Sequence, residues 1–199
     1  MHRRADVVAT ALDILGDVGL PDLTMRRLGA ALGVQQSAIY HHFANKQALL
    51  GAVADEIIAR GPHTTPPMDA GWAQRVRLRC TDVHAAVLAY ADGADVVMSM
   101  FAFGLGGGAA YDGLRDLLRD ASLTGPQAAT AAATLLHYVY GHAFDTQTRA
   151  QAARVGAITV RHDASDGGAR TAGDDFADGL DYVIAGIESS TRIGAPPAQ

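Results

Sequence analysis

Residues 33–49, GVQQSAIYHHFANKQAL, gather hydrogen-bonding side chains in a chain that is 49% hydrophobic. Most of these side chains are uncharged. They include Gln35, Gln36, Ser37, Tyr40, His41 and His42. Catalysis, metal binding and contact with the polar edges of another molecule would each need a different arrangement of such groups. The spacing of the residues and the surrounding elements therefore decide between these chemistries.

The residue types argue against a metal centre or an enzyme. Adjacent residues such as His41 and His42 point about 100° apart on a helix, whereas helical chelates use positions i and i+4. Cys80 is the only cysteine, which excludes an intramolecular disulfide and a cysteine-based zinc site. The chain has no G-x-S-x-G and no H-E-x-x-H motif. We expect no metal, no cofactor and no catalytic residues.

Apolar periodicity predicts the helices that position the polar segment. Thr24 is a suitable N-cap for a short helix that includes Leu28, and Gly33 suits a left-handed position after it. A further short helix is expected over 35–42, and Asn45 is suited to cap the next one, over 46–61. These follow a longer helix over 3–19. Two short helices joined by a glycine-containing turn make a helix-turn-helix.

In a helix-turn-helix the second helix enters the major groove of DNA, and its first residues meet base edges. Glutamine pairs bidentately with adenine, and serine can serve several base edges. Lys46, the only lysine, stands at the start of a helix whose N-terminus also favours an anion. The predicted DNA contacts are Thr24, Arg26, Gln35, Gln36, Ser37, Tyr40, His41, His42 and Lys46.

The charge distribution permits such contact without requiring it. The formal net charge is −5, but residues 1–50 carry +1 and residues 51–199 carry −6. A local field can attract DNA to an otherwise acidic protein. The asymmetry is small, so the charge adds modest support.

The rest of the chain reads as a helical body. A Pro- and Gly-rich stretch at 61–71 is expected to be a linker, and 155–173 a mobile loop. Helical patterns cover 72–91, 94–104, 110–121, 126–150 and 174–191. No apolar run reaches the length of a membrane span, and the start lacks a secretory signal, so we expect a cytoplasmic location. The predicted fold class is all-α, with a DNA-binding domain at 1–46, a connecting helix and linker at 47–69, and a larger helical domain at 70–199, to which the family resemblance described below assigns ligand binding and dimerisation.

A family resemblance rests on the stretch TALDILGDVGLPDLTMRRLGAALGVQQSAIYHHFANKQALLGAVADEI. It resembles the DNA-binding head of TetR-family transcriptional regulators. The resemblance implies an all-helical homodimer, usually a repressor that binds a palindromic DNA operator and is released by a small-molecule effector. Three stretches of the body are similar to the tetracycline-repressor branch: YADGADVV, HYVYGHAFDTQ and DFADGLDYVIAGIES.

The effector implied by this branch needs qualification. Val97 stands where that branch places a metal-coordinating histidine, and Asp145 stands where it has a glutamate, while His137 keeps a matching histidine. These departures predict a metal-free pocket for an effector other than a magnesium–tetracycline complex. Methionine and aromatic side chains suit such a pocket, and a few polar groups would orient the ligand. The predicted ligand-binding residues are His84, Met98, Met100, Phe101, Phe103, His137, Tyr138 and Asp145.

The dimer is expected to use apolar stripes on the helices over about 126–146 and 174–191. The predicted interface residues are Leu135, Leu136, Tyr140, Phe176, Leu180, Val183, Ile184 and Ile187. A two-fold interface is the commonest oligomer symmetry, and it spaces two recognition helices about one turn of DNA or a multiple apart.

Two other classes of protein remain open. The stretch DVVMSMFAFGLGGGAAYDGLRDLL could form a strand, a glycine turn and a helix, as in a nucleotide-binding enzyme. No further strand–helix units are evident to build the parallel sheet that such an enzyme needs. The other class is a helical small-molecule-binding protein whose head has no operator function.

Overall fold

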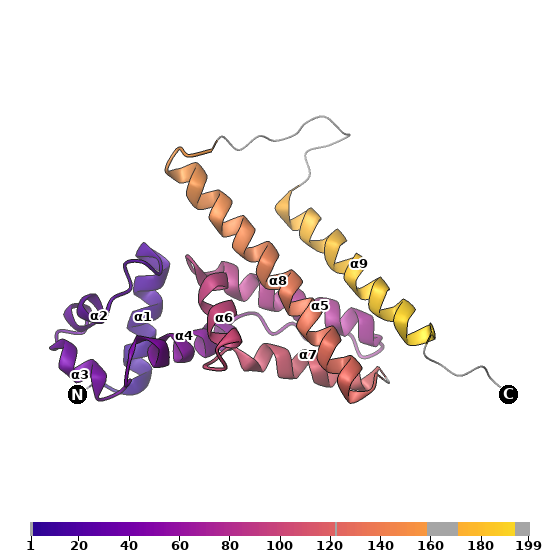
Figure 1. Cartoon of the computed structure of the whole chain (residues 1–199), viewed down its shortest axis with the longest axis horizontal. Coiled ribbons are helices and arrows are strands. Elements are labelled where there is room, and N and C mark those ends of the chain that lie inside the picture. Colours follow the sequence, from indigo (N-terminus) through magenta and orange to yellow (C-terminus); the bar gives the residue numbers. More distant parts are fainter. Residues whose placement is uncertain (1, 122, 159–170, 194–199) are drawn as a thin grey trace. The chain divides into compact units, whose positions relative to one another are not determined.

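The computed structural model describes residues 2–121, 123–158 and 171–193, and within these ranges it contains helices and no strand (Figure 1). The predicted all-α fold class is confirmed. The helices are α1 (Arg4–Val18), α2 (Met25–Ala31), α3 (Gln36–Tyr40), α4 (Lys46–Arg60), α5 (Trp72–Leu88), α6 (Gly93–Ala102), α7 (Gly108–Asp120), α8 (Gly125–Arg154) and α9 (Ala172–Ile193).

The chain divides into two compact units. Unit 1 consists of Met1–His63 and Asp82–Ala110, and unit 2 consists of Thr64–Thr81 and Tyr111–Gln199. Helix α5 contributes its first half to unit 2 and its second half to unit 1. The predicted domain boundaries at 46 and 69 stay a prediction.

The predicted helix caps of unit 1 are confirmed. The side chain of Thr24 accepts a hydrogen bond from the backbone N–H of Arg27 at 3.1 Å. Asn45 accepts from the N–H of Ala48 at 2.8 Å in the same way. Each cap satisfies a backbone donor that the first turn of a helix leaves unpaired. The caps therefore fix where α2 and α4 begin.

Helices α1 and α4 form the core that supports the head. Leu12 and Leu15 on α1 are fully buried, as are Val53 and Ile57 on α4. Each buried side chain of this size contributes about 1.5–3 kcal/mol relative to an exposed one. The apolar stripes of these helices therefore face inward, as the sequence predicts.

Helix α6 is joined at both ends to the N-terminal part of unit 1. At its start, Asp92 has a left-handed backbone (φ 56°), and its carboxylate accepts a hydrogen bond from the N–H of Leu20 at 2.8 Å. Just beyond its end, the N–H of Gly107 donates to Asp55 on α4 at 2.7 Å. These bonds fix α6 against the α1–α2 connection and against α4.

The strand required by the nucleotide-binding alternative is not formed. Residues 93–102 are helical, and the described residues hold no strand that could build a parallel sheet. Two of the glycines that follow α6, Gly106 and Gly107, serve close packing instead. A Cβ at Gly106 would overlap the backbone of Gly51 on α4. The strand–turn–helix interpretation of this stretch is therefore wrong.

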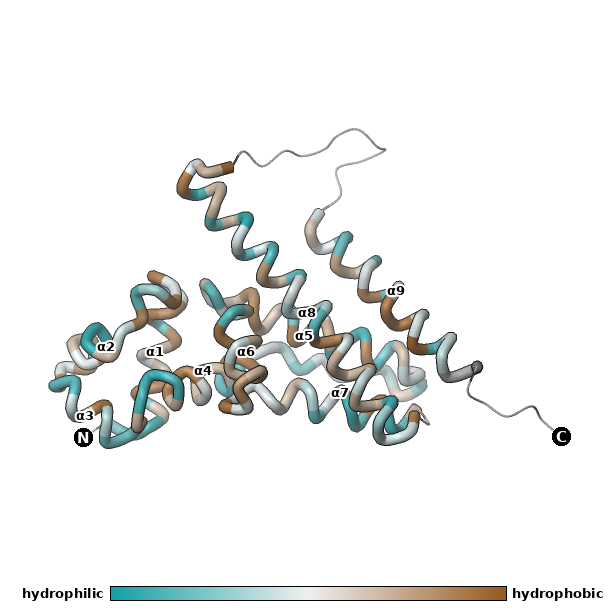
Figure 2. Tube along the Cα trace, viewed as in Figure 1, coloured by the Kyte–Doolittle hydropathy of each residue, from teal (hydrophilic) through white to brown (hydrophobic). Residues whose placement is uncertain are grey.

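Unit 2 is built around α8 and α9, which lie side by side and alternate hydrophobic and hydrophilic residues along their lengths (Figure 2). Tyr138 on α8 donates its hydroxyl hydrogen bond to the carbonyl oxygen of Phe176 on α9 at 2.9 Å. The rings of these two residues stack at 5.6 Å. Arg77 on α5 pairs with Asp181 on α9 at 2.7 Å.

Two expectations concern the ends of these helices and membrane spans. Most of the loop predicted over 155–173 lies outside the described residues. In the described parts, no single helix is long and apolar enough to cross a membrane. Only α5 and α6 taken together meet that criterion, across a bend of 114°.

Candidate nucleic-acid interface and ligand site

The turn between α2 and α3 is tight because two glycines allow it. Gly33 has a φ of 66°, the left-handed conformation that L side chains rarely adopt. The N–H of Val34 donates to the carbonyl oxygen of Gly29 at 2.9 Å, and a Cβ at Gly29 would lie only 3.0 Å from the oxygen of Val34. This close approach sets α3 against the end of α2, as a helix-turn-helix requires.

One face of α3 is anchored and the other is open. Ile39 is 1% exposed and Phe43, just after the helix, is 2% exposed, so both belong to the core of unit 1. The predicted DNA-contacting side chains here are Gln35, Gln36, Ser37, Tyr40 and His41, which are exposed, and His42, which is half-buried. These side chains are therefore accessible within one short segment, 35–42, with Tyr40 at 45% exposure.

The exposed side chains of α3 include one internal contact. The amide nitrogen Nε2 of Gln36 donates to the hydroxyl of Tyr40 at 3.3 Å. These residues lie four positions apart, which places them on the same face of the helix. Both remain open to a partner on that face.

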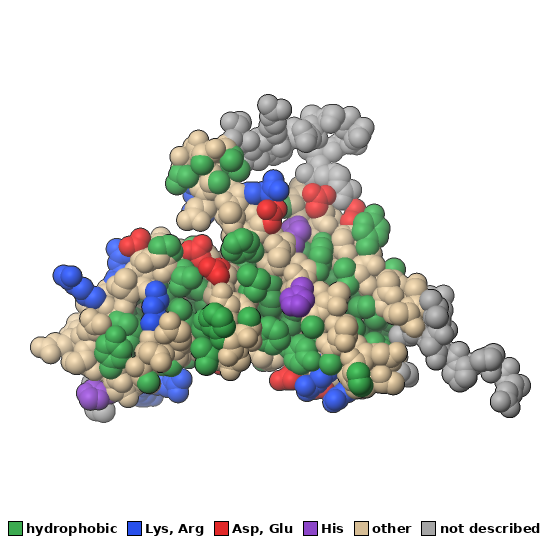
Figure 3. Space-filling view, viewed as in Figure 1, with side chains coloured by type: hydrophobic (Ala, Val, Ile, Leu, Met, Phe, Trp, Pro, Cys, Tyr) green, Lys and Arg blue, Asp and Glu red, His purple; other side chains and the backbone are tan. Residues whose placement is uncertain are grey.

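The other predicted DNA contacts lie at the starts of the neighbouring helices. Thr24 is exposed and caps α2, while Arg26 projects from its first turn. Lys46 is the first residue of α4, where backbone N–H groups also favour an anion. Figure 3 shows Lys and Arg side chains over the N-terminal helices on the face in view.

Residues at the start of the chain, absent from the predicted DNA contacts, also lie beside the turn. Nε2 of His2 lies 2.9 Å from the carbonyl oxygen of Leu32, at the turn between α2 and α3. The guanidinium of Arg4 lies 4.6 Å from the centre of the Phe43 ring, a cation–π contact. The Arg3–Arg4 pair was the available signal, but only the fold brings the start of the chain beside the turn.

The predicted ligand-binding residues are divided between the two units. Those on α5, α6 and just after α6 belong to unit 1, and those on α8 belong to unit 2; they are His84, Met98, Met100, Phe101 and Phe103, and His137, Tyr138 and Asp145, respectively. Within unit 1, His84 is 8% exposed and Met100 is 3% exposed. Their assignment to a pocket stays a prediction.

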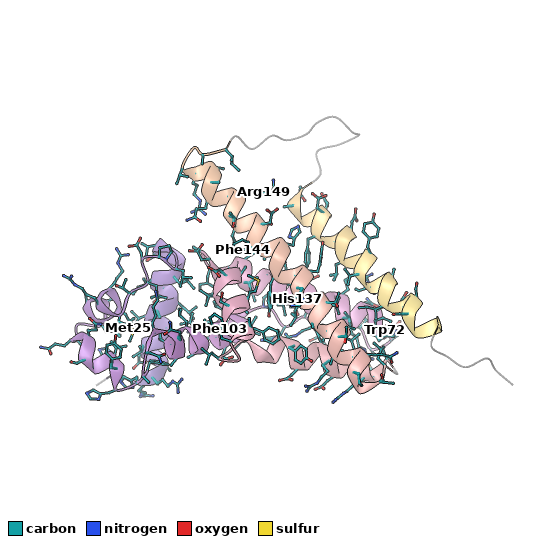
Figure 4. All side chains as sticks on the ribbon, viewed as in Figure 1. Met25, Trp72, Phe103, His137, Phe144 and Arg149 are labelled. Atoms are coloured by element: carbon teal, nitrogen blue, oxygen red, sulfur yellow. The ribbon has the colours of Figure 1, made fainter. Side chains whose placement is uncertain are left out.

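Three of these ligand candidates have exposed side chains. Phe103 is 66% exposed, His137 is exposed, and Asp145 is exposed and pairs with Arg149 at 2.7 Å; Figure 4 labels Phe103, His137 and Arg149. Tyr138 differs, because partial burial and the carboxylates of Asp175 and Asp178 raise its pKa above the usual value. The Tyr138 hydroxyl therefore stays protonated and bonded to α9.

Most side chains predicted for a dimer interface are covered within one chain. Seven are buried in unit 2, namely Leu135, Leu136, Tyr140, Phe176, Leu180, Ile184 and Ile187. Their burial within one chain makes them core residues. Val183 alone among the eight is partly exposed. The neighbouring face of these helices is more exposed.

That neighbouring face carries a groove of about 580 Å³. Its lining comes from the first half of α8 with the preceding Leu123, and from the second half of α9; it comprises Leu123, Pro126, Gln127, Thr130, Ala131, Thr134, Tyr182, Val183, Gly186, Ile187 and Ser190. None of the predicted ligand-binding residues lines it. Tyr182 at its edge is 77% exposed, an unusual position for a large aromatic side chain.

The described residues hold no group of three or more His, Cys, Asp or Glu side chains that could bind a metal ion. His41 and His42 follow one another at the end of α3. Val97, at the position where the resemblance would place a histidine ligand, is fully buried.

Two family models match the sequence. Residues 7–53 match the model described as bacterial regulatory proteins, tetR family, and residues 65–191 match the tetracyclin repressor-like C-terminal domain. The first match contains α2 and α3 with their turn. The second covers more than half of the chain. The resemblance stated from the sequence is confirmed by these matches.

Individual relatives agree with the family models. The tetracycline repressor protein class C of Escherichia coli is 44% identical over 95 residues, which are 47% of this chain and 43% of that protein. The match thus spans less than half the length of this curated relative.

Among solved structures, Mycobacterium smegmatis BioQ is 36% identical with a TM-score of 0.82, and the match covers 95% of this chain and 99% of that one. A structure of BioQ with its natural double-stranded DNA operator is 34% identical with a TM-score of 0.76, covering 94% and 98%. A TetR variant from Acinetobacter baumannii AYE in complex with minocycline is 28% identical with a TM-score of 0.75, covering 95% and 98%.

Proposed function

This chain belongs to the tetR family of bacterial regulatory proteins, and from that premise we propose that it is a dimeric transcriptional repressor. It binds a palindromic double-stranded DNA operator through α3 and its neighbours, and a small-molecule effector releases it. The family is regulatory and not catalytic, and we extend this to the present chain as a non-enzyme that acts in the cytoplasm.

The open face of α3 carries this proposal. Ile39 and Phe43 are buried and anchor the helix, while Gln36, Ser37 and Tyr40 are exposed. The polar side chains can therefore enter the major groove of DNA without any change in the fold of the head. The BioQ structure with its operator supports the same use of the head, because BioQ matches nearly the whole chain. The base-reading role belongs to Gln35, Gln36 and Ser37.

Phosphate contacts are assigned to side chains around the base-reading helix. Arg26 and Lys46 supply positive charge at the starts of α2 and α4, and Thr24, Tyr40, His41 and His42 supply hydrogen bonds. Such contacts fix the register of the head on the duplex without reading sequence.

We assign the groove on α8 and α9 to a second copy of this chain. A monomer rarely leaves an aromatic side chain as open as that of Tyr182 beside an apolar groove. Val183 and Ile187 continue that groove from the buried stripe of α9. A two-fold axis here makes the same surface serve both copies, and it produces the paired heads that a palindrome needs.

The effector acts through α6 in this proposal. Met98 and Phe101 lie on α6, whose ends are bonded to the α1–α2 connection through Asp92 and to α4 through Asp55. A ligand that prefers a different position of α6 would shift both the Asp92 and the Asp55 hydrogen bonds. Affinity for DNA then falls by the ligand's differential affinity for the two states, typically about 1–3 kcal/mol per linked event.

The effector is a metal-free small organic molecule. The residues assigned to it within unit 1 are apolar and aromatic, with His84 as a polar group that orients it. By the family resemblance, Val97 stands where a metal-dependent tetracycline site has a histidine, which supports a metal-free effector. The minocycline complex of the Acinetobacter protein shows that a relative binds a drug-sized molecule.

Selection from a pool of duplex DNA with a random core tests the proposal. The full chain should enrich one inverted repeat with half-sites about one helical turn or a multiple apart, and should repress a reporter gene that carries it. Failure to enrich any duplex would favour the other open class, a helical ligand-binding protein without operator function.

A further inference from the structure

Gln36 and Tyr40 form a pair on the open face of α3. Nε2 of Gln36 donates to the phenol oxygen of Tyr40 at 3.3 Å, and both side chains are exposed. Ile39, between them in sequence, is buried and fixes the rotation of the helix. Both side chains of the pair are therefore available to the DNA that α3 is proposed to contact.

The chemistry of a carboxamide makes this contact informative. A glutamine side chain offers one oxygen that accepts and one nitrogen with two N–H donors. Bidentate pairing with adenine uses the oxygen together with the N–H on the same side. The second N–H points away from that edge and is the one available to Tyr40. Donation to Tyr40 therefore leaves the amide oxygen and the other N–H of Gln36 free to pair with adenine, and it holds them in one orientation.

The hydroxyl of Tyr40 can also donate one hydrogen bond. When the phenol donates that proton to a DNA phosphate, it can only accept from Gln36, because it has a single O–H. Gln36 must then present its nitrogen to Tyr40 and its oxygen to the groove. A rotated amide would present two N–H donors to the groove, which suits the two acceptors of guanine.

Given the proposed function, we propose that Tyr40 is a positioning residue that sets the amide of Gln36 for adenine. The phosphate contact of Tyr40 and the base contact of Gln36 are one coupled unit in the bound state. Tyr40 therefore contributes to sequence specificity without touching a base.

The test measures base preference separately from overall affinity. Wild-type protein, Tyr40→Phe, Gln36→Ala and the double variant are titrated with the duplex selected from the random pool. A panel changes each base pair of one half-site in turn. Gln47→Ala is a matched control, since it removes an exposed glutamine on α4 that has no assigned DNA contact. Circular dichroism and melting temperature confirm that each variant folds.

We expect Tyr40→Phe to lower the adenine-over-guanine preference about tenfold at one base pair only, in line with the value of a bidentate contact. That position should be the one at which Gln36→Ala also loses preference, and the double variant should lose no more than Gln36→Ala alone. Gln47→Ala should leave the preference at every position unchanged.

The outcomes separate this inference from the function on which it rests. If Tyr40→Phe weakens every duplex in the panel equally, Tyr40 is only a phosphate contact and the positioning role is overturned. Additive losses in the double variant overturn it as well. If the wild-type protein selects no duplex at all, the proposed function fails.

Discussion

The carboxylate of Asp92 accepts a hydrogen bond from the backbone N–H of Leu20 at 2.8 Å, and so joins the start of α6 to the connection between α1 and α2. The backbone of Gly19 comes so close that a Cβ there would lie 2.6 Å from the same carboxylate oxygen. This bond links residues 72 positions apart within unit 1. In the proposed mechanism, this bond transmits a movement of α6, on which the effector acts, directly to the DNA-binding helices.

Asp92→Ala should lower the free energy of unfolding by about 2 kcal/mol. It removes a hydrogen bond to a charged acceptor and places alanine at a φ of 56°, which costs about 1 kcal/mol or more by itself. Urea titration monitored by circular dichroism gives the value. Asp92→Asn is the control, because asparagine keeps an acceptor and tolerates the left-handed region. If both variants lose the same free energy of unfolding, neither the hydrogen-bond acceptor nor the left-handed backbone explains the loss.

Gly51→Ala should destabilise the protein by about 2 kcal/mol, because a Cβ there would overlap the carbonyl of Leu105. Gly141→Ala is the matched control, since this glycine lies inside α8 with no atom within 4 Å of the added Cβ. The control should stabilise the helix by about 0.5–1 kcal/mol. Opposite shifts of the melting temperature are expected, and a neutral Gly51→Ala would contradict the close contact of α4 with the loop after α6.

Local features of the fold could be predicted from the sequence because they depend on neighbouring residues. Thr24 and Asn45 cap helices through bonds to residues three positions away, and Gly33 adopts its left-handed backbone within one turn. The helix-turn-helix was predicted from such signals. The bond between Asp92 and Leu20 has no local signal, since nothing in either segment identifies its partner.

The roles of apolar side chains were harder to predict. Leu135 and Tyr140 carry the pattern of a buried stripe, but a stripe covered by α9 and one covered by a second copy have the same composition. The structure places these two residues in the core of a single chain. Tyr182, which the sequence analysis did not select, is the large side chain left exposed at the groove.

Lys46→Ala should weaken binding to all duplexes alike and reduce the slope of log affinity against log salt by about one. The lysine contacts phosphate in the proposal, and each neutralised phosphate contributes about one released counterion. Gln36→Ala should instead cost about 1–3 kcal/mol at one base pair and leave the salt slope unchanged. Fluorescence anisotropy between about 50 and 200 mM salt separates the two. Equal effects on every duplex for both variants would contradict the assigned roles.

Cys80 should be unreactive in the folded protein, because burial raises its pKa from 9.0 to about 12. A thiol reagent at pH 8 should label it only after denaturation, and as the only cysteine it gives an unambiguous signal. Because the folded state keeps this proton longer than the unfolded state, its contribution to stability is full below pH 9 and is lost as pH rises toward 12. Burial raises the pKa of Tyr140 too, so it adds to the same loss above pH 10.

Cys80→Ala removes the first part of that alkaline loss. The variant is less stable at neutral pH, because it leaves a small cavity, but its free energy of unfolding should decline less between pH 9 and pH 10. Urea titrations at several pH values give both curves. Parallel curves for the variant and the wild-type protein would mean that the thiol does not titrate differently in the two states.

Tyr182→Glu should convert the dimer to a monomer. The charge would enter the groove between α8 and α9, where a second copy is proposed to pack, and an unpaired buried carboxylate is strongly unfavourable. Light scattering after size exclusion should then report the mass of one chain, 20.7 kDa, instead of twice that value. Operator affinity should fall with it, because a single head contacts only one half-site.

Ala185→Glu is the matched control for this prediction. Ala185 is exposed on the same helix but does not line the groove, so the same charge there should leave the dimer intact. Since Tyr182 is already 77% exposed in one chain, its substitution should not unfold the monomer, and circular dichroism should be unchanged. A Tyr182→Glu protein that stays dimeric would place the two-fold contact on another surface. A dimer lost equally in both variants would show that the charge on α9, and not the groove, controls assembly.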